Sequence, residues 1–387
     1  MLAGSVVVSS LGLWGAVPAR AAEAPVNATV ECGNVAGLIN AVNQANANIG
    51  GGTIKLARGC AYRFEDDYLD SGNALPAITR TVTIIGEHST LIRSSYHGAN
   101  LFRILAVNKG GRLTLKGVTV TGGDTPGDGG GITNEGTLRL ERSTVAGNQA
   151  GGDGGGISNE GGTVTLVDSR ILVNVVTNPN PSPNAEEAGD GGGLSNNAAG
   201  TLTLLKTTVW GNTADEGGGG IQNQGTLVIE KSRIKNNEAR DDDGGAINNE
   251  GTAIIKDSEI EENWAGIEGG AINNGEDATL NVFDTSFEFN TAGRDGGAIN
   301  NEGTAIIKES EIEENQAGRN GGGINNEQEA GADTAQLTLD YTTVEKNRAA
   351  GVGGGINNWV GAQVTLKKSE IVMNLPTNCA GNVPGCW

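Results

Sequence analysis

The chain is poor in the residues that build metal and redox centres. Its 387 residues include only 4 cysteines and 2 histidines, His88 and His97. No two cysteines stand in a Cys-x-x-Cys spacing and no Cys/His cluster occurs, which argues against a zinc or redox site. The cysteines stand near the two ends of the chain, which predicts local disulfides in an oxidising compartment. The expected pairs are Cys32–Cys60 and Cys379–Cys386.

Positive charge is also scarce. Lysine and arginine number 26 against 46 acids, so the formal net charge is −20. This surplus of negative charge argues against nucleic acid and anionic membranes as partners. An anionic polymer could be a partner only with the help of a cation or a local basic strip.

Long apolar runs are absent, so no membrane insertion is expected. The apolar stretch Val6–Val17 is too short to span a bilayer, and Ala19-Arg20-Ala21 has the form of a cleavage site. Residues 1–21 are therefore predicted to be a secretory signal peptide, which makes the protein secreted and extracellular. A charged segment before the apolar stretch is missing, so the true start could lie upstream. The alternative is that this stretch is a buried first strand.

What the chain has instead is a repeat, Gly-Gly-x-Ile-x-Asn, which occurs nine times between Gly129 and Asn358, with Leu194 as the only substitute for the isoleucine. Successive copies lie 25 to 37 residues apart, a period that indicates a solenoid. Two further apolar pieces follow each turn, such as Thr201–Leu204 and Ser258–Ile260. Alternation over so few residues between polar corners predicts three short strands per rung. The expected fold is a parallel β-coil in which each strand pairs with its copy one rung above.

Asparagines recur at two corners of the predicted rung, one set from Asn134 to Asn358 and the other from Asn148 to Asn374. Asparagine suits tight corners, and stacked amides can donate to the copy above. We therefore predict two structural asparagine ladders, with a ligand-binding row as the alternative.

The N-terminal segment is predicted to close the end of the coil. Val35, Leu38, Ile39 and Val42 fall on one face of a helix, and a solenoid end needs a cap. The expected organisation is a cap with an amphipathic helix over residues 22–52 and a β-coil over residues 53–374. A C-terminal disulfide clip is expected over residues 375–387.

These features resemble the right-handed parallel β-helices of the pectate-lyase-like superfamily. The cap Val30-Glu31-Cys32-Gly33 and the pairing of Phe287–Asn290 with Gly296–Ile299 are similar to secreted bacterial proteins with polymorphic-outer-membrane-type repeats. The resemblance implies a single all-β, right-handed solenoid of about twelve rungs. It leaves activity open, because the superfamily includes lyases, hydrolases, adhesins and scaffolds. No membrane barrel follows the rungs, so a secreted, unanchored protein is expected.

No catalytic residue is assigned from the sequence. Arg233-Ile234-Lys235 matches a segment that polygalacturonases use, but the aspartates that accompany it in that family are missing. Gly244–Asn263 and Gly296–Asn315 are identical except for one residue, and duplicated rungs are poor places for a unique site. The irregular segments are better candidates for a site: residues 62–103, Val175–Asp190 and Glu327–Gln336.

An acid stands four residues before the isoleucine in most repeats. In stacked rungs such carboxylates would lie about 4.8 Å apart and repel by roughly 0.9 kcal/mol in water, or roughly 3.5 at an effective dielectric of 20. A divalent cation between rungs, such as Ca²⁺, would reverse this repulsion. The alternative is ordinary turn chemistry with screened charges. The candidate calcium ligands are Asp128, Asp153, Asp190, Asp243, Glu268 and Asp295.

The expected function is binding without catalysis. We predict a secreted solenoid that presents repetitive faces to a polysaccharide or cell-surface component, while the oligomeric state stays open. The alternative is a polysaccharide lyase, or less readily a glycoside hydrolase, acting on an acidic polysaccharide. A partial basic strip is expected from four lysines that directly follow the second strand and could share a corner: Lys206, Lys256, Lys308 and Lys367.

Overall fold

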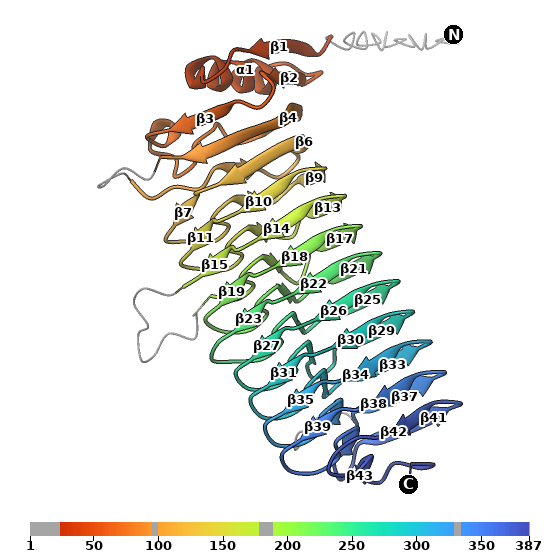
Figure 1. Ribbon diagram of the computed structural model, residues 1–387. Helices are drawn as coiled ribbons and strands as arrows, with labels where there is room; N and C mark the ends of the chain where they lie inside the picture. The colour runs from red at the N-terminus through yellow and green to blue at the C-terminus, as the bar shows by residue number, and fades with distance from the viewer. Residues whose placement is uncertain (1–23, 95–99, 178–188, 329–333, 387) are drawn as a thin grey trace, which may run out of the picture.

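The structure is a computed structural model that describes residues 24–94, 100–177, 189–328 and 334–386. The predicted signal peptide, residues 1–21, lies outside these ranges. The described part is a right-handed parallel β-solenoid of about 13 turns, with α1 (Val35–Ala47) at its N-terminal end (Figure 1). The predicted fold class, capping helix and approximate rung count are confirmed. Within the described ranges no helix has the length and apolar character needed to cross a membrane.

Each regular rung contributes four strands to three sheets. The sheets contain 23, 9 and 11 strands and are called sheets 1, 2 and 3 here. In a typical rung, a five-residue strand and a three-residue strand lie in sheet 1, a two-residue strand lies in sheet 2, and the Ile-x-Asn strand lies in sheet 3. Neighbouring rungs pair in parallel, so Leu227 of one rung lies opposite Ala253 of the next.

The same order of strands is repeated along the coil. Sheet 1 begins with β1 (Val26–Val30), β2 (Gly52–Leu56), β3 (Ala61–Phe64), β4 (Thr81–Arg93) and β6 (Arg112–Thr121). Its longer regular strands are β9 (Thr137–Glu141), β13 (Thr163–Val167), β17 (Thr201–Leu205), β21 (Thr226–Glu230), β25 (Thr252–Lys256), β29 (Thr279–Phe283), β33 (Thr304–Lys308), β37 (Gln336–Asp340) and β41 (Gln363–Lys367). Its shorter strands are β10 (Thr144–Ala146), β14 (Arg170–Leu172), β18 (Thr208–Trp210), β22 (Arg233–Lys235), β26 (Glu259–Glu261), β30 (Ser286–Glu288), β34 (Glu311–Glu313), β38 (Thr343–Glu345) and β42 (Glu370–Val372).

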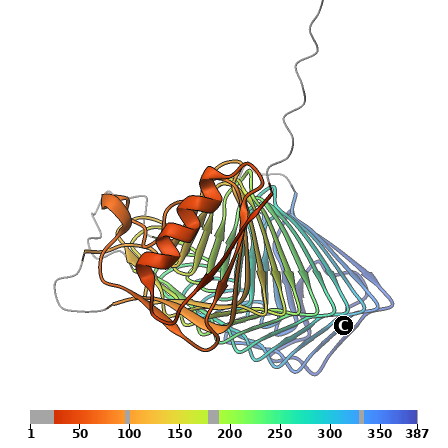
Figure 2. The same ribbon diagram turned by 90° about the horizontal axis from the view of Figure 1, so that it is seen from above.

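Sheets 2 and 3 complete the cross-section of the coil (Figure 2). Sheet 2 contains β7 (Asp124–Thr125), β11 (Gln149–Ala150), β15 (Val175–Val176), β19 (Thr213–Ala214), β23 (Glu238–Ala239), β27 (Trp264–Ala265), β31 (Thr291–Ala292), β35 (Gln316–Ala317) and β39 (Arg348–Ala349). Sheet 3 contains β5 (Leu105–Val107), β8 (Ile132–Asn134), β12 (Ile157–Asn159), β16 (Leu194–Asn196), β20 (Ile221–Asn223), β24 (Ile247–Asn249), β28 (Ile272–Asn274), β32 (Ile299–Asn301), β36 (Ile324–Asn326), β40 (Ile356–Asn358) and β43 (Cys379–Gly381). A short 3₁₀ helix, η1 (Tyr68–Asp70), lies between β3 and β4.

The prediction of three strands per rung was incomplete, because it missed the strands of sheet 2. Each of these strands is only two residues long, and its second residue, such as Ala239 or Ala265, is fully buried. Two residues cannot show an alternating pattern, so periodicity in the sequence does not reveal them.

Sheet 1 is folded along a line that runs the length of the coil. On this line one residue per regular rung has a left-handed backbone, with φ between 45° and 52°. A side chain in this conformation is disfavoured unless the surrounding structure holds it. We call these residues the bend row: Arg142, Asp168, Lys206, Lys231, Asp257, Asp284, Glu309, Tyr341 and Lys368.

The residue after each bend-row residue is a serine or threonine that stabilises the bend. The Ser232 hydroxyl donates to the carbonyl of Glu230 at 2.9 Å, and the Ser232 N–H donates to the Ser258 hydroxyl of the next rung at 3.1 Å. Thr285 and Ser310 repeat this contact at 3.2 Å. The hydroxyl ladder thus replaces backbone bonds that the bend would otherwise break.

The two predicted asparagine ladders are present and buried. In sheet 3, Asn134 Nδ2 donates to Asn159 Oδ1 at 2.7 Å, and the same contact recurs up to Asn358. At the other corner, Asn237 donates to Asn263 Oδ1 through both its amide nitrogen and its backbone N–H. These side chains are at most 5% exposed, which excludes the alternative of a ligand-binding row.

The N-terminal helix and the two disulfides lie at the ends of the coil. Leu38, Ala41, Val42 and Ala45 of α1 are buried against the first rungs (Figure 2). The disulfides Cys32–Cys60 and Cys379–Cys386 are both formed.

Candidate functional site

The predicted acid row lies in the turns that connect sheet 2 to sheet 3. Asp128 Oδ1 accepts the backbone N–H of Asp153 at 2.8 Å, and Asp153 Oδ1 accepts that of Asp190 at 3.0 Å. Asp190, Asp243 and Asp295 each accept an N–H of the next rung in the same way, at 2.8 Å. The aspartates therefore have a structural role, because each one satisfies a backbone donor of the following turn.

Burial raises the pKa of two aspartates in this row, Asp190 and Asp243. Burial, followed by the charge of Asp153, raises the pKa of Asp190 to about 8. Burial, followed by the charge of Asp242, raises the pKa of Asp243 to about 7. Protons on these groups at neutral pH relieve the repulsion on which the calcium prediction depends. Calcium binding by the row therefore stays a prediction.

Glu268 departs from the pattern, because its longer side chain reaches outward over sheet 3. Its Oε2 accepts the Nδ2 of Asn300 at 3.0 Å, and the same nitrogen lies 2.9 Å from Glu302 Oε1. Glu268, Glu302 and Glu327 bring carboxylate oxygens within 4.8 Å of one another. Burial, followed by the charge of Glu327, raises the pKa of Glu268 to about 8. This triad has the donor set that could hold a divalent cation.

Two arginines supply positive charge beside the same triad. Arg294 lies 3.4 Å and Arg319 3.8 Å from Glu268 Oε1. Arg319 Nε also donates to Asp295 Oδ1 at 2.9 Å. Part of the negative charge is thus balanced within the protein.

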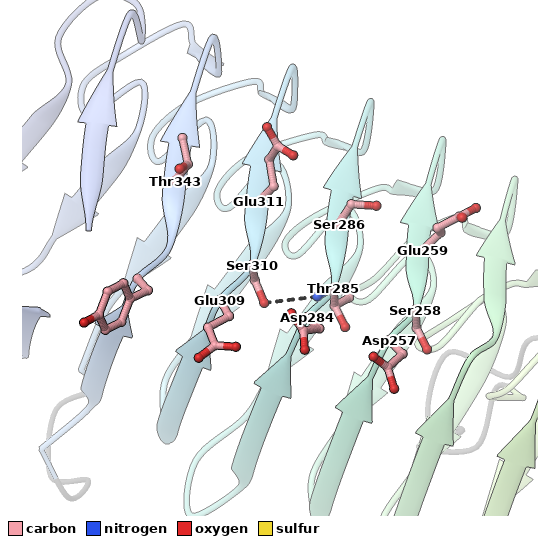
Figure 3. A pocket seen from close by; sticks show the side chains of 11 residues that line it. Asp257, Ser258, Glu259, Asp284, Thr285, Ser286, Glu309, Ser310, Glu311 and Thr343 are labelled. Atoms are coloured by element: carbon pink, nitrogen blue, oxygen red, sulfur yellow. Dashed lines mark hydrogen bonds between the residues drawn. The ribbon is translucent and has the colours of Figure 1, made fainter. Parts of the chain in front are cut away.

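A groove that the sequence did not reveal follows the bend of sheet 1. Three cavities of about 400, 240 and 680 Å³ lie along it in order from the N-terminal end. Figure 3 shows the third cavity, where Asp257, Asp284 and Glu309 project from the bend row of successive rungs. The second and third cavities share Asp257 and Glu259, so they belong to one continuous surface. We call the line of these three cavities along the bend row the bend groove.

The charge of the bend groove changes along its length. The first cavity is lined by Arg58, His88, Lys116 and Arg142, with Glu87 beside them. The second cavity is mixed, because Lys206, Lys231 and Arg233 line it together with Asp257 and Glu259. The third is acidic, and its charged lining residues are Asp257, Glu259, Asp284, Glu309 and Glu311.

The predicted lysine strip was wrong in its register. Lys206 is a bend-row residue, whereas Lys256 is the last residue of β25 and lies opposite Glu230 and Phe283. Lys308 and Lys367 share the position of Lys256 and not that of Lys206. The four lysines therefore occupy two different rows and do not form one strip.

The other sites considered from the sequence have less support. Arg233 and Lys235 flank the buried Ile234 and form ion pairs with Glu259 and Glu262, as solvated strand residues do. In the insertion Val175–Asp190, residues 178–188 lie outside the described ranges, as do residues 329–333 of the insertion Glu327–Gln336.

Comparison with known proteins gives no match to a family model, to a curated protein or to a solved structure, so the function rests on this molecule's own geometry.

Proposed function

We propose that this protein is a secreted, non-catalytic β-solenoid that binds a polysaccharide or another cell-surface component along the bend groove. Its two disulfides indicate an oxidising environment. The resemblance of its repeats to those of the pectate-lyase-like superfamily and of polymorphic outer-membrane proteins is consistent with such a role.

The observation that carries the proposal is the repetition of the groove. Every regular rung adds a left-handed bend residue, a serine or threonine, and an outward residue of the following strand, as with Asp257, Ser258 and Glu259. A ligand that contacts one rung can therefore contact the next, and linked contacts strengthen one another. Catalysis instead needs one asymmetric arrangement around a single bond.

The test is retention of the intact protein on a panel of immobilised glycans, followed by analysis of the glycan for cleavage. Retention without cleavage is the expected result. A protein that is retained on no glycan and no cell-surface preparation would contradict the proposal.

The first cavity favours a second candidate, a lyase that acts on an acidic polysaccharide. His88 has a left-handed backbone, with φ of 73°, and stands beside Arg58, Lys116 and Arg142. A neutral imidazole can remove a proton, while nearby cations stabilise a developing negative charge. A lyase would give an unsaturated product, detected by its ultraviolet absorbance, and His88→Ala would abolish it. Absence of product with uronate polymers would exclude this candidate.

A further inference from the structure

The long strands of sheet 1 carry an uncharged outer face in a highly charged protein. Their second and fourth residues are buried, as Leu227 and Ile229 are in β21, so their first and third residues point outward. From β13 to β33 none of these outward residues is charged, although the chain contains 46 acids and 26 basic residues. We call this set the threonine face: Thr163, Thr165, Thr201, Thr203, Thr226, Val228, Thr252, Ile254, Thr279, Asn281, Thr304 and Ile306.

The threonine face is a regular array of two columns. Its first column is threonine in every strand, and each threonine lies directly opposite its copy in the next rung, as Thr201 does opposite Thr226. The second column, from Thr165 to Ile306, pairs in the same register. The strands stack one above another along the coil (Figure 1). Residues of a column therefore repeat at about 4.8 Å over a length of about 24 Å, and the two columns lie about 6.6 Å apart.

The hydroxyls of this face are free to bind water. In the hydroxyl ladder beside the bend row, Thr207, Ser232 and Thr285 each donate to a backbone carbonyl. In contrast, no hydroxyl of the threonine face forms a hydrogen bond with another group of the protein within the described ranges. A hydroxyl can both donate to water and accept from it. Water molecules bound to these hydroxyls would therefore follow the repeat of the columns.

The side chains of the face have little freedom to move. A β-branched side chain is stiff at χ1, and each threonine also stands between copies in the neighbouring rungs. Val228, Ile254 and Ile306 place the same branched shape in the second column without a hydroxyl. The face thus combines fixed hydroxyls with fixed methyl groups, and such a surface can hold water molecules at set positions.

Ice is a partner whose surface repeats in this way. Water molecules on its prism faces recur at distances close to those between neighbouring threonines and between the two columns. Ice offers no counter-charge, and a charged group pressed against it would lose hydration without compensation, so an uncharged face is complementary to it. Charged residues stand only at the margins of the face, where Arg139 lies in the preceding strand and Glu230 and Lys256 end their strands beside it.

Two other occupants fit the face less well. A second copy of the chain packed on it would bury the threonine hydroxyls, and a hydroxyl buried without a partner costs free energy. A sugar ring would lack an aromatic side chain on which to stack, because none of the twelve residues of the face is aromatic.

We propose that the threonine face from β13 to β33 binds ice. The water molecules that its hydroxyls and methyl groups hold in order would join the ice lattice and attach the protein to it. The inference goes beyond the proposed function, because the face and the bend groove are built from different residues.

The experiment measures how the full chain distributes between slowly growing ice and the remaining liquid, since growing ice excludes ordinary solutes. A double variant, Thr226→Lys and Thr252→Lys, places two charges in the middle of the first column, where both side chains are exposed. The matched control, Thr213→Lys and Thr291→Lys, makes the same change at partly exposed outward positions of sheet 2. Melting curves show whether each variant is folded, and sedimentation gives its oligomeric state.

We expect the wild-type protein and the control to be enriched in the ice. The face variant should lose at least about tenfold in this partition, because ice cannot compensate the two lysines for lost hydration. Exclusion of the wild-type protein from ice, an unchanged partition of the face variant, or an equal loss in the control would overturn the inference. A dimer that only the face variant loses would identify a second copy as the occupant and overturn it too. Retention on glycans is measured separately, so failure of the proposed function would leave the result with ice unaffected.

Discussion

Replacing Asp190 with asparagine is expected to make the protein more stable at alkaline pH. The substitution keeps the side-chain oxygen that accepts the N–H of Gly217 at 2.8 Å. It removes a carboxyl group whose pKa burial raises from the ordinary value of 3.8 to about 8. In the wild-type protein this group stabilises the fold when it is protonated and destabilises it when it is ionised.

The direction and size of the effect follow from linkage. Since the pKa is higher in the folded than in the unfolded chain, the stabilising contribution is complete below about pH 4 and is lost as the pH rises through about 8. A tenfold change in proton affinity is worth about 1.4 kcal/mol, so the wild-type protein should lose about 4 kcal/mol between pH 5 and pH 9. The raised pKa values of Asp243 and Glu268 act in the same direction.

The assay is thermal unfolding at pH 5 and pH 9 in EGTA, because a bound cation would hold the carboxylate ionised. The gain in melting temperature of Asp190→Asn over the wild-type protein should be small at pH 5 and about 5 °C larger at pH 9. Asp257→Asn, at an exposed bend-row position, is the matched control and should show no such pH-dependent gain. The reasoning is refuted if Asp190→Asn changes the melting temperature equally at both pH values, or if the wild-type protein is insensitive to pH in this range.

Three other predictions concern calcium, the ladders and the cap. Ca²⁺ should raise the melting temperature at pH 9 and Glu268→Gln should reduce this gain, whereas equal midpoints in Ca²⁺ and in EGTA would refute calcium binding by the acid rows. Asn237→Ala should lower the free energy of unfolding by about 3 kcal/mol, because the buried N–H of Asn212 loses its acceptor and the buried carbonyl of Val209 loses its side-chain donor; the exposed control Gln316→Ala should change it by less than about 0.5 kcal/mol in denaturant titrations. Replacing Cys32 and Cys60 with serine should lower the free energy of unfolding by about 2–4 kcal/mol in the same titrations. Proteolysis of this variant should begin in the N-terminal cap. Cleavage that begins elsewhere would count against a local effect of the disulfide.

Much of the fold could be predicted because each rung buries the same types of residue at the same positions. Isoleucine at the turn, alternation along the second strand and asparagine at two corners appear in nearly every repeat. Ile247 and Asn249 of β24 are examples, since both are fully buried and both stack on the equivalent residues of the next rung.

The bend groove could not be predicted in the same way. Its defining residues include an arginine, a tyrosine and several acids, such as Arg142, Tyr341 and Glu309, which share a backbone conformation and no side-chain property. The conformation is held by the next residue, a serine or threonine, and the sequence shows this residue only as part of a strand. The signal that could have revealed the groove is the position directly before the Ser/Thr-x-Ile motif, where Lys231 and Asp257 stand.

The acid row shows a different limit. The stacking of Asp153 and Asp190 could be inferred from the repeat, but their contacts with the N–H of the following turn could not. Those contacts depend on the path of the glycine-rich turn in three dimensions.

The buried asparagine ladders have one more consequence, which concerns how the molecule can change in length. In both ladders every side-chain amide donates to the next rung toward the C-terminus. Each rung therefore offers the same acceptor to the preceding rung and the same donor to the following one. The members at the two ends differ: among the described residues nothing donates to Asn134 Oδ1, and Asn358 donates to the carbonyl of Asn382 in the C-terminal segment. A whole rung can therefore be copied into the middle or deleted from it without altering either terminus. The near-identity of Gly244–Asn263 and Gly296–Asn315 is the result that such copying would leave in the sequence. The length of the coil can thus change in steps of one rung.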